Sequence, residues 1–194
     1  MFRSNVTLSD KSLLIVEVLA PDLFRIRLDA TGKFPAGGVE RYQMLNLDWP
    51  ECTVQEQKCG DDLLFKTEQA ELRVDCTDGN FRLNRVDGSE LVRTDAPPKG
   101  SQDTGFNLRL QLHADERLYG LGDESRTELN KRGHDKIMSI TNVSAYTPIP
   151  FFSSSRGWGL YLNTTWLHRF DGGKKNPDVL QLFSQKGMLE CFLF

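Results

Sequence analysis

Residues 118–152 read LYGLGDESRTELNKRGHDKIMSITNVSAYTPIPFF, and the fold prediction starts from this stretch. Its middle keeps neither a helical nor a strand period. Three glycines interrupt it, Pro148 and Pro150 restrict its backbone, and Phe151 and Phe152 close it. We therefore predict that a strand ends near the start of this stretch, that a long loop, called the excursion below, leaves the sheet, and that the chain then returns into a sheet. Excursions of this length in a compact domain usually carry function, and the aromatic and β-branched content argues against disorder.

Short strand-like segments flank the excursion on both sides. Ser12–Leu19 is almost continuously apolar, and Leu23–Asp29 alternates between apolar and polar residues after a turn. The other strand-like segments are short and separated by turns; they span 63–67, 70–75, 80–85, 90–93 and 106–113 before the excursion, and 157–163, 167–171, 179–184 and 188–194 after it. This spacing predicts an all-β fold with little helix, in which two antiparallel sheets pack face to face as one domain over residues 1–194.

Two stretches lack the strand pattern. Residues 31–50 contain several glycines and prolines without a sustained period, which predicts a long loop with an aromatic anchor at Trp49. Residues 95–104 are rich in Gly, Pro and Ser and form the best candidate linker. They do not mark a domain boundary, because strict alternation resumes at Phe106.

The overall composition excludes several classes of partner. A formal charge of −3 and a pI near 5.7 give no electrostatic footprint for nucleic acid. The longest apolar run, LLIVEVLA, is too short to span a bilayer, and the first residues lack the apolar core of a signal peptide. We therefore expect a cytoplasmic protein that binds neither nucleic acid nor membrane.

No cofactor or metal is expected from the sequence. The four cysteines show none of the close pairing that zinc or a redox dithiol requires, so they are interpreted as buried free thiols; they are Cys52, Cys59, Cys76 and Cys191. His134 and Asp135 could hold a metal ion, but a surface histidine beside the basic turn Lys131-Arg132 is the favoured interpretation.

Two constellations suggest carbohydrate chemistry. Asp123 and Glu124 resemble the acid pair of a glycosidase, yet neighbours in an extended segment point to opposite faces and cannot converge on one bond. Trp158, Tyr161 and Trp166 lie close together on a glycine-bounded hairpin. Their rings could stack on sugars, or they could pack in the core as alternating aromatic residues commonly do.

The order of several motifs is more specific than any one of them. They are YGLGD, then LNKRG at 129–133, then IPFF, the GWGLYLN hairpin and RFDGG. Over about residues 117–194 this series resembles glycoside hydrolase family 31, which comprises α-glucosidases, α-xylosidases and their relatives. The resemblance implies the family's amino-terminal β-sandwich, similar to galactose mutarotase, packed on a catalytic (β/α)8 barrel that would follow residue 194.

The resemblance also implies that this segment does not catalyse the reaction. In the family the nucleophile and the general acid/base are aspartates of the barrel. Their motifs, Asp-Met-Asn and Gly-Asp-Asn, do not occur in these 194 residues. The parent polypeptide would be a retaining α-glycosidase, and the segment alone is expected to be inactive and to need no cofactor.

A contribution to the substrate site is expected from the loop at 136–147. In the family, this excursion reaches over the barrel mouth, and an aspartate in a Trp-Asn-Thr-Asp-like stretch binds sugar hydroxyls. By position that stretch corresponds to SITNV, with Asn142 at the aspartate and Ser139 at the tryptophan. An amide makes neutral instead of charge-assisted hydrogen bonds. The candidate substrate-binding residues are Asn142, Tyr146 and Trp158, for an α-glucoside or α-xyloside oligosaccharide.

Two other functions stay open at this point. A free-standing carbohydrate-binding module would use the aromatic group at Trp158, Tyr161 and Trp166. A sugar epimerase on the similar fold would need a pair of histidines and a carboxylate around one pocket.

Overall fold

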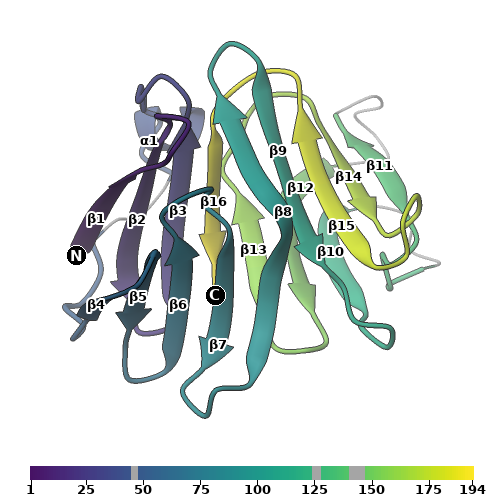
Figure 1. The fold of residues 1–194 in the computed structure, drawn as a ribbon. Helices are drawn as coiled ribbons and strands as arrows, with labels where there is room; N and C mark the ends of the chain where they lie inside the picture. The colour runs from purple at the N-terminus through teal and green to yellow at the C-terminus, as the bar shows by residue number, and fades with distance from the viewer. Residues whose placement is uncertain (45–47, 124–127, 140–146) are drawn as a thin grey trace.

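Two antiparallel sheets make up the chain in the computed structural model, which describes residues 1–44, 48–123, 128–139 and 147–194. The seven-stranded sheet has the order β1-β2-β3-β16-β13-β12-β10: β1 Phe2–Thr7, β2 Leu13–Ala20, β3 Leu23–Asp29, β16 Leu189–Leu193, β13 Gly159–Leu162, β12 Thr147–Ser154 and β10 Leu118–Asp123. Figure 1 shows this sheet behind the second one, which carries β8 and β9 in front.

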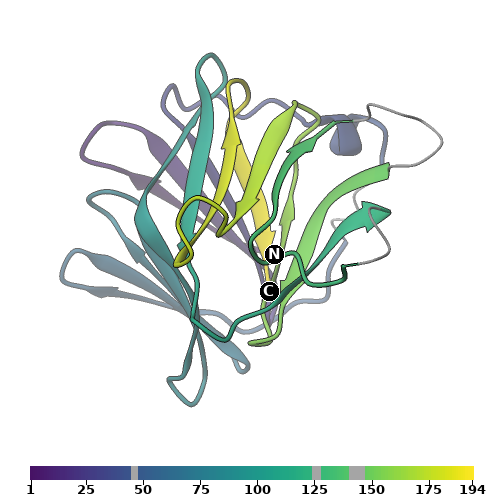
Figure 2. The same ribbon diagram turned by 90° about the vertical axis from the view of Figure 1, so that its right-hand side faces the viewer.

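The nine-stranded sheet has the order β11-β14-β15-β9-β8-β7-β6-β5-β4. Its strands are β11 Asp135–Met138, β14 His168–Gly172, β15 Val179–Ser184, β9 Gly105–Gln111, β8 Glu90–Ser101, β7 Phe81–Arg85, β6 Ala70–Asp75, β5 Asp62–Lys66 and β4 Gln55–Cys59. Seen from the end where β11 and β14 lie, the two sheets face each other (Figure 2). The predicted all-β sandwich is confirmed.

Alternation along the strands explains where the core lies. In β6, Ala70, Leu72 and Val74 are buried while the residues between them are half-buried, as the period of two requires. The inward faces of both sheets join in one hydrophobic cluster. Its largest fully buried side chains are five phenylalanines: Phe24, Phe65, Phe106, Phe152 and Phe170.

The expected linker at 95–104 is wrong, because β8 continues through most of it to Ser101. The register of β8 against β9 shifts between Thr94 and Ala96 and again between Ala96 and Lys99. These bulges accommodate Pro97 and Pro98, which cannot donate to a regular ladder. Beyond them the carbonyl of Gly100 accepts a hydrogen bond from the Ala30 amide (2.8 Å), so the two sheets meet at this corner.

Other differences concern elements without an apolar pattern. β1, β4 and β11 were not predicted, since these short strands at sheet edges carry few buried apolar residues. The expected loop at 31–50 contains a single helical turn, α1 (Gly38–Arg41). Within the described residues this is the only helix, and at four residues it is too short to cross a membrane.

Candidate functional site

The excursion leaves and re-enters the sandwich around one hollow. Met138 and Ser139 stand at the end of β11, and Pro148 and Pro150 at the start of β12. Together with residues 164–168 they line a hollow of about 440 Å³. The described flanks of residues 140–146 therefore lie close together, although β11 and β12 belong to different sheets.

Strand β11 is held in place by its pairing with β14. Met138 stands opposite His168, and Asp135 stands opposite Asp171. The Asp135 carboxylate forms an ion pair with Arg169 through both of its oxygens. The hydrogen bonds from Arg169 lower the pKa of Asp135, so the carboxylate stays charged and paired at neutral pH.

His168 forms part of the wall of the hollow as a structural residue. It is 5% exposed, and burial lowers the pKa of its imidazole. Its Nδ1 lies 2.9 Å from the carbonyl oxygen of Trp166. Because a carbonyl oxygen can only accept, the neutral ring carries its proton on Nδ1 and ties the 166–168 turn to β14.

Of the three predicted substrate-binding residues, Asn142 and Tyr146 lie outside the described residues. Trp158 lies in the core, with 2% of its surface exposed. Its ring meets Phe152 edge to face at a centroid distance of 5.7 Å. This burial fits core packing, the alternative weighed from the sequence, so Trp158 offers no ring face to a sugar. Sugar binding remains a prediction for Asn142 and Tyr146.

The partner of Trp158 is a buried carboxylate that the sequence did not reveal. Glu116 is 1% exposed. It accepts hydrogen bonds from the Trp158 indole N–H (2.8 Å), the His113 amide (2.9 Å) and the Ser154 hydroxyl (2.5 Å). These bonds join the segment before β10 to the β12–β13 hairpin. The role of Glu116 is therefore structural.

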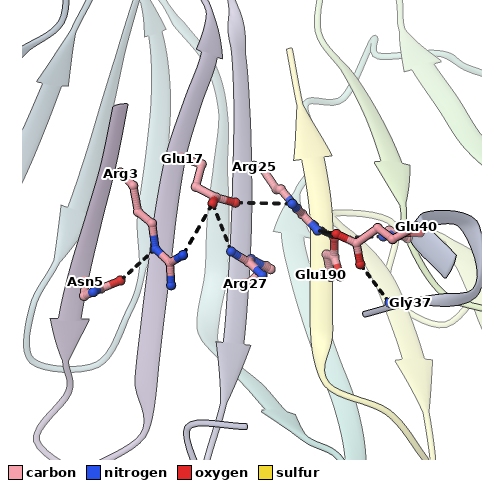
Figure 3. A network of polar contacts seen from close by, with 9 residues as sticks. Arg3, Asn5, Glu17, Arg25, Arg27, Gly37, Glu40 and Glu190 are labelled. Carbon is pink, nitrogen blue, oxygen red and sulfur yellow. Dashed lines mark hydrogen bonds and ion pairs between the residues drawn. The ribbon is translucent and has the colours of Figure 1, made fainter. Parts of the chain in front are cut away.

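The outer face of the seven-stranded sheet carries a second set of buried charges (Figure 3). Glu17 on β2 stands opposite Arg25 on β3, and Arg27 stands opposite Glu190 on β16. Glu17 lies 3.4 Å from Arg25 Nη1 and 3.0 Å from Arg27 Nη2. Arg25 also binds Glu190 through its Nε (2.8 Å). The sequence signal was present, since each charge interrupts an apolar run at an alternate position.

The loop after β3 closes over this cluster. Glu40 of α1 pairs with Arg25 and accepts a hydrogen bond from the Gly37 amide (2.7 Å). On the same face the Arg27 guanidinium lies 5.5 Å from the centroid of the Phe34 ring. The expected loop thus covers the sheet face and removes its charges from water, leaving Arg25 only 3% exposed.

This cluster does not have the properties of a glycosidase acid pair. Burial raises the pKa of Glu190, while Arg25 and a hydrogen bond from Asn163 (2.8 Å) act against the rise. Glu17 and Glu190 are both paired with Arg25, which neutralises charge between them instead of leaving space for a substrate. The arrangement fastens three strands and a loop.

The two residues weighed for metal binding, His134 and Asp135, each face a charged side chain, Glu128 and Arg169 respectively. No group of three His, Cys, Asp or Glu residues that could hold a metal ion occurs in the described part of the chain. His134 lies 2.8 Å from Glu128, with the imidazole Nε2 facing the carboxylate. All four cysteines are free, although only Cys191 is fully buried, where burial raises the pKa of its thiol to about 12.

Comparison with known proteins identifies this architecture. Residues 13–171 match the model of the glycosyl hydrolase 31 N-terminal galactose mutarotase-like domain. The chain belongs to this family. The resemblance seen in the motifs from YGLGD to RFDGG is thereby confirmed.

The family 31 relatives are much longer than this chain. The α-xylosidase XylQ of Lactiplantibacillus pentosus is 27% identical over 166 residues, which cover 78% of this chain and 21% of XylQ. The family 31 dextranase of Flavobacterium johnsoniae, solved with isomaltotriose, superposes with a TM-score of 0.84 at 20% identity over 99% of this chain and 25% of the dextranase. A soil-metagenome α-xylosidase solved with xylose gives 0.78 at 17% identity, over 98% and 31% of the two chains.

Proposed function

We propose that this chain is the non-catalytic N-terminal domain of a family 31 retaining α-glycosidase and packs on a catalytic (β/α)8 barrel. The observation that carries the proposal is the match of residues 13–171 to the family's N-terminal domain, with the whole chain corresponding to about a quarter of the dextranase. The barrel motifs Asp-Met-Asn and Gly-Asp-Asn are missing from the 194 residues. Sequencing the gene downstream of codon 194 tests the proposal, because an encoded barrel should follow in frame.

The segment 136–147 is proposed to form part of the substrate pocket. The described residues at its two ends, in and beside β11 and β12, line one hollow, so both ends lie at the same place on the sandwich. An α-glucoside or α-xyloside oligosaccharide is the proposed ligand. The relatives solved with isomaltotriose and with xylose support this substrate class. A cytoplasmic location is proposed as well, and cell fractionation tests it.

The purified chain should not hydrolyse aryl α-glucosides or aryl α-xylosides. The physical reason is that glycoside hydrolysis needs two carboxyl groups facing each other across the bond, roughly 5 to 9.5 Å apart. The buried carboxylates Glu17, Glu116 and Glu190 are instead engaged by arginines or hydrogen-bond donors. Release of the aryl group is followed by absorbance. Turnover that co-purifies with this polypeptide through successive columns would contradict the proposal.

Asn142 is expected to contribute to sugar binding in the polypeptide that carries the barrel. Asn142→Ala should weaken binding by about 1 kcal/mol, as the loss of one neutral hydrogen bond does. Inhibition by the product sugar gives the measurement. Thr141→Ala, a change beside it in the same segment, serves as the control. Equal inhibition constants for Asn142→Ala and the unchanged enzyme would remove Asn142 from the site.

The two alternative functions, a free-standing carbohydrate-binding module and a sugar epimerase, are tested by different experiments. A free-standing carbohydrate-binding module binds maltose or xyloglucan fragments without a barrel, which calorimetry on the isolated chain measures. An epimerase would need two histidines around one pocket. However, Met138 stands opposite His168 and Asp135 opposite Asp171, so His134 and His168 lie at opposite ends of the β11–β14 pair. Polarimetry of glucose anomerisation tests this remaining activity.

A further inference from the structure

Trp166 is an exposed aromatic residue at the meeting point of three hollows. Its side chain is 49% exposed, in the segment between β13 and β14. Besides the 440 Å³ hollow, it lines an apolar one of about 380 Å³ with Ile137, Leu167 and Phe183. It also lines a more polar one of about 230 Å³ that includes Asn163. A large aromatic surface that stays exposed beside a polar hollow is a feature of ligand sites.

The ring is held in position by its neighbours. Gly187 lies directly beneath it, since a Cβ at that position would come within 2.4 Å of Trp166 Cδ1. Gly187 also has a φ of +86°, so both the close approach and the backbone favour glycine. The Lys186 ammonium lies 5.6 Å from the ring centroid. A ring fixed before binding loses little conformational freedom when a ligand stacks on it.

The polar hollow beside Trp166 has a rigid base. Asn163 is 8% exposed and donates from its amide to Glu190 (2.8 Å), which Arg25 holds in turn. This bond leaves the Asn163 carbonyl oxygen as an acceptor that makes no hydrogen bond with the described residues. The buried ion cluster thus fixes the orientation of one amide at the base of the hollow.

Hydrogen-bonding side chains, both charged and neutral, line the hollow around Asn163. The polar residues that line the hollow are Arg41, Gln102, Asn163, Thr164, Thr165 and Glu190. Arg41 belongs to α1, and its guanidinium makes no ion pair or hydrogen bond with the part of the chain that the structure describes. The Glu190 carboxylate is already paired with Arg25. A single arginine, Arg41, among amides and hydroxyls is too little positive charge to select a phosphate group. The same set of donors and acceptors suits a neutral sugar ring with several hydroxyl groups.

We infer that Trp166 and the hollow beside it bind one ring of a neutral saccharide. The ring's C–H face stacks on the indole, and its hydroxyls reach Asn163, Arg41 and the two threonines. At about 230 Å³ the hollow is below the roughly 300 Å³ at which pockets for drug-sized ligands begin, which fits a single sugar unit. The inference does not depend on the proposed barrel, because every residue of the site belongs to this chain.

The test is a titration of the isolated, isotope-labelled chain with xylose, glucose and isomaltotriose, followed by NMR. The chain has three tryptophans, so their indole N–H signals can be assigned by substitution. The Trp166 signal should shift saturably with at least one sugar, while the buried Trp158 signal serves as the internal reference. Trp166→Ala should weaken binding about tenfold, Trp166→Phe should retain it within about threefold, and Arg41→Gln should weaken it about threefold.

Leu167→Ala provides the matched control. Leu167 is 63% exposed and borders the apolar hollow but not the polar one, so its removal should leave the affinity within about twofold. Absence of a saturable Trp166 shift up to the solubility of each sugar would overturn the inference. Binding that Trp166→Ala leaves unchanged would overturn it too. Either result would leave the N-terminal-domain proposal intact, since that proposal is tested by the downstream gene sequence and by the activity assay.

Discussion

Arg25→Met is expected to destabilise the fold by about 3–5 kcal/mol, the cost of removing one partner from a buried ion cluster. Arg25 is 3% exposed and pairs with Glu17, Glu40 and Glu190. Its loss takes away the arginine that pairs with Glu40 and Glu190, and leaves Glu17 with Arg27 as its nearest counter-charge. Urea denaturation followed by circular dichroism measures the change. The matched control is Arg3→Met, whose side chain is 48% exposed and lies 4.0 Å from Glu17; it should cost less than about 1 kcal/mol.

The effect of Arg25→Met should depend on pH in a defined direction. Burial already raises the pKa of Glu190, and removing Arg25 takes away the attraction that opposes this rise. A carboxyl group whose folded pKa is raised destabilises the fold above that pKa, and the penalty disappears as pH falls toward the unfolded value of about 4.3. The deficit should therefore be smaller near pH 5 than at pH 8.

A second substitution separates charge from packing in the ion cluster. Adding Glu190→Gln to Arg25→Met removes one of the uncompensated charges while keeping the side-chain shape. This double variant should recover part of the lost stability at pH 8. A loss below about 1 kcal/mol for Arg25→Met, or a deficit that grows on acidification, would contradict the assigned role of the cluster.

Trp158→Ala is expected to cost about 3–5 kcal/mol, as large-to-small changes of a buried aromatic residue do. The change would empty a core position beside Phe152 and remove the indole donor that Glu116 accepts from. Trp158→Phe would refill most of the space but would leave Glu116 without one of its hydrogen-bond donors. This variant should lower the stability of the fold by about 1–3 kcal/mol. Thermal and urea unfolding provide the measurements.

Trp166→Ala is the matched control, because the same residue type is removed from an exposed position. It should change stability by about 0.5 kcal/mol or less. The sequence left core packing and sugar stacking open for both tryptophans. These results would assign packing to Trp158 and sugar binding to Trp166. A stable Trp158→Ala protein with weakened sugar binding would reverse this division.

The fold was predictable from local patterns to a large extent. The alternation in Leu23–Asp29 and Ala70–Asp75 predicted both strands to the residue, since a period of two reports directly on one buried face. The expected linker failed because prolines and glycine also occur in bulged strands, as β8 shows. The short edge strands β1, β4 and β11 bury little apolar surface and therefore carried no signal.

The candidate site was predictable only in part. The excursion was placed correctly between a strand end and a return into a sheet, since β10 and β12 lie at its two ends and pair with each other. Strand β11 lies inside the excursion and was not predicted. Burial of Trp158 could not be read from its spacing, since stacking platforms and core residues use the same aromatic types. The polar hollow at Trp166 combines residues from the loop after β3 with residues near β14 and β16, and such proximity has no local signature.

The sequence by itself determined the all-β class, most strand positions and the family, because these depend on alternation along single strands and on the order of local motifs. Only the tertiary structure decided which face of each strand is covered. On an open sheet, the charged side chains of the ion cluster would be exposed to solvent; they are Glu17, Arg25 and Glu190. They are buried because the segment that carries Phe34 and Glu40 folds over them. The period of two along a strand assigns each residue to one face of the sheet. The segment that packs on that face comes from a distant part of the chain, so the strand's own sequence does not reveal it.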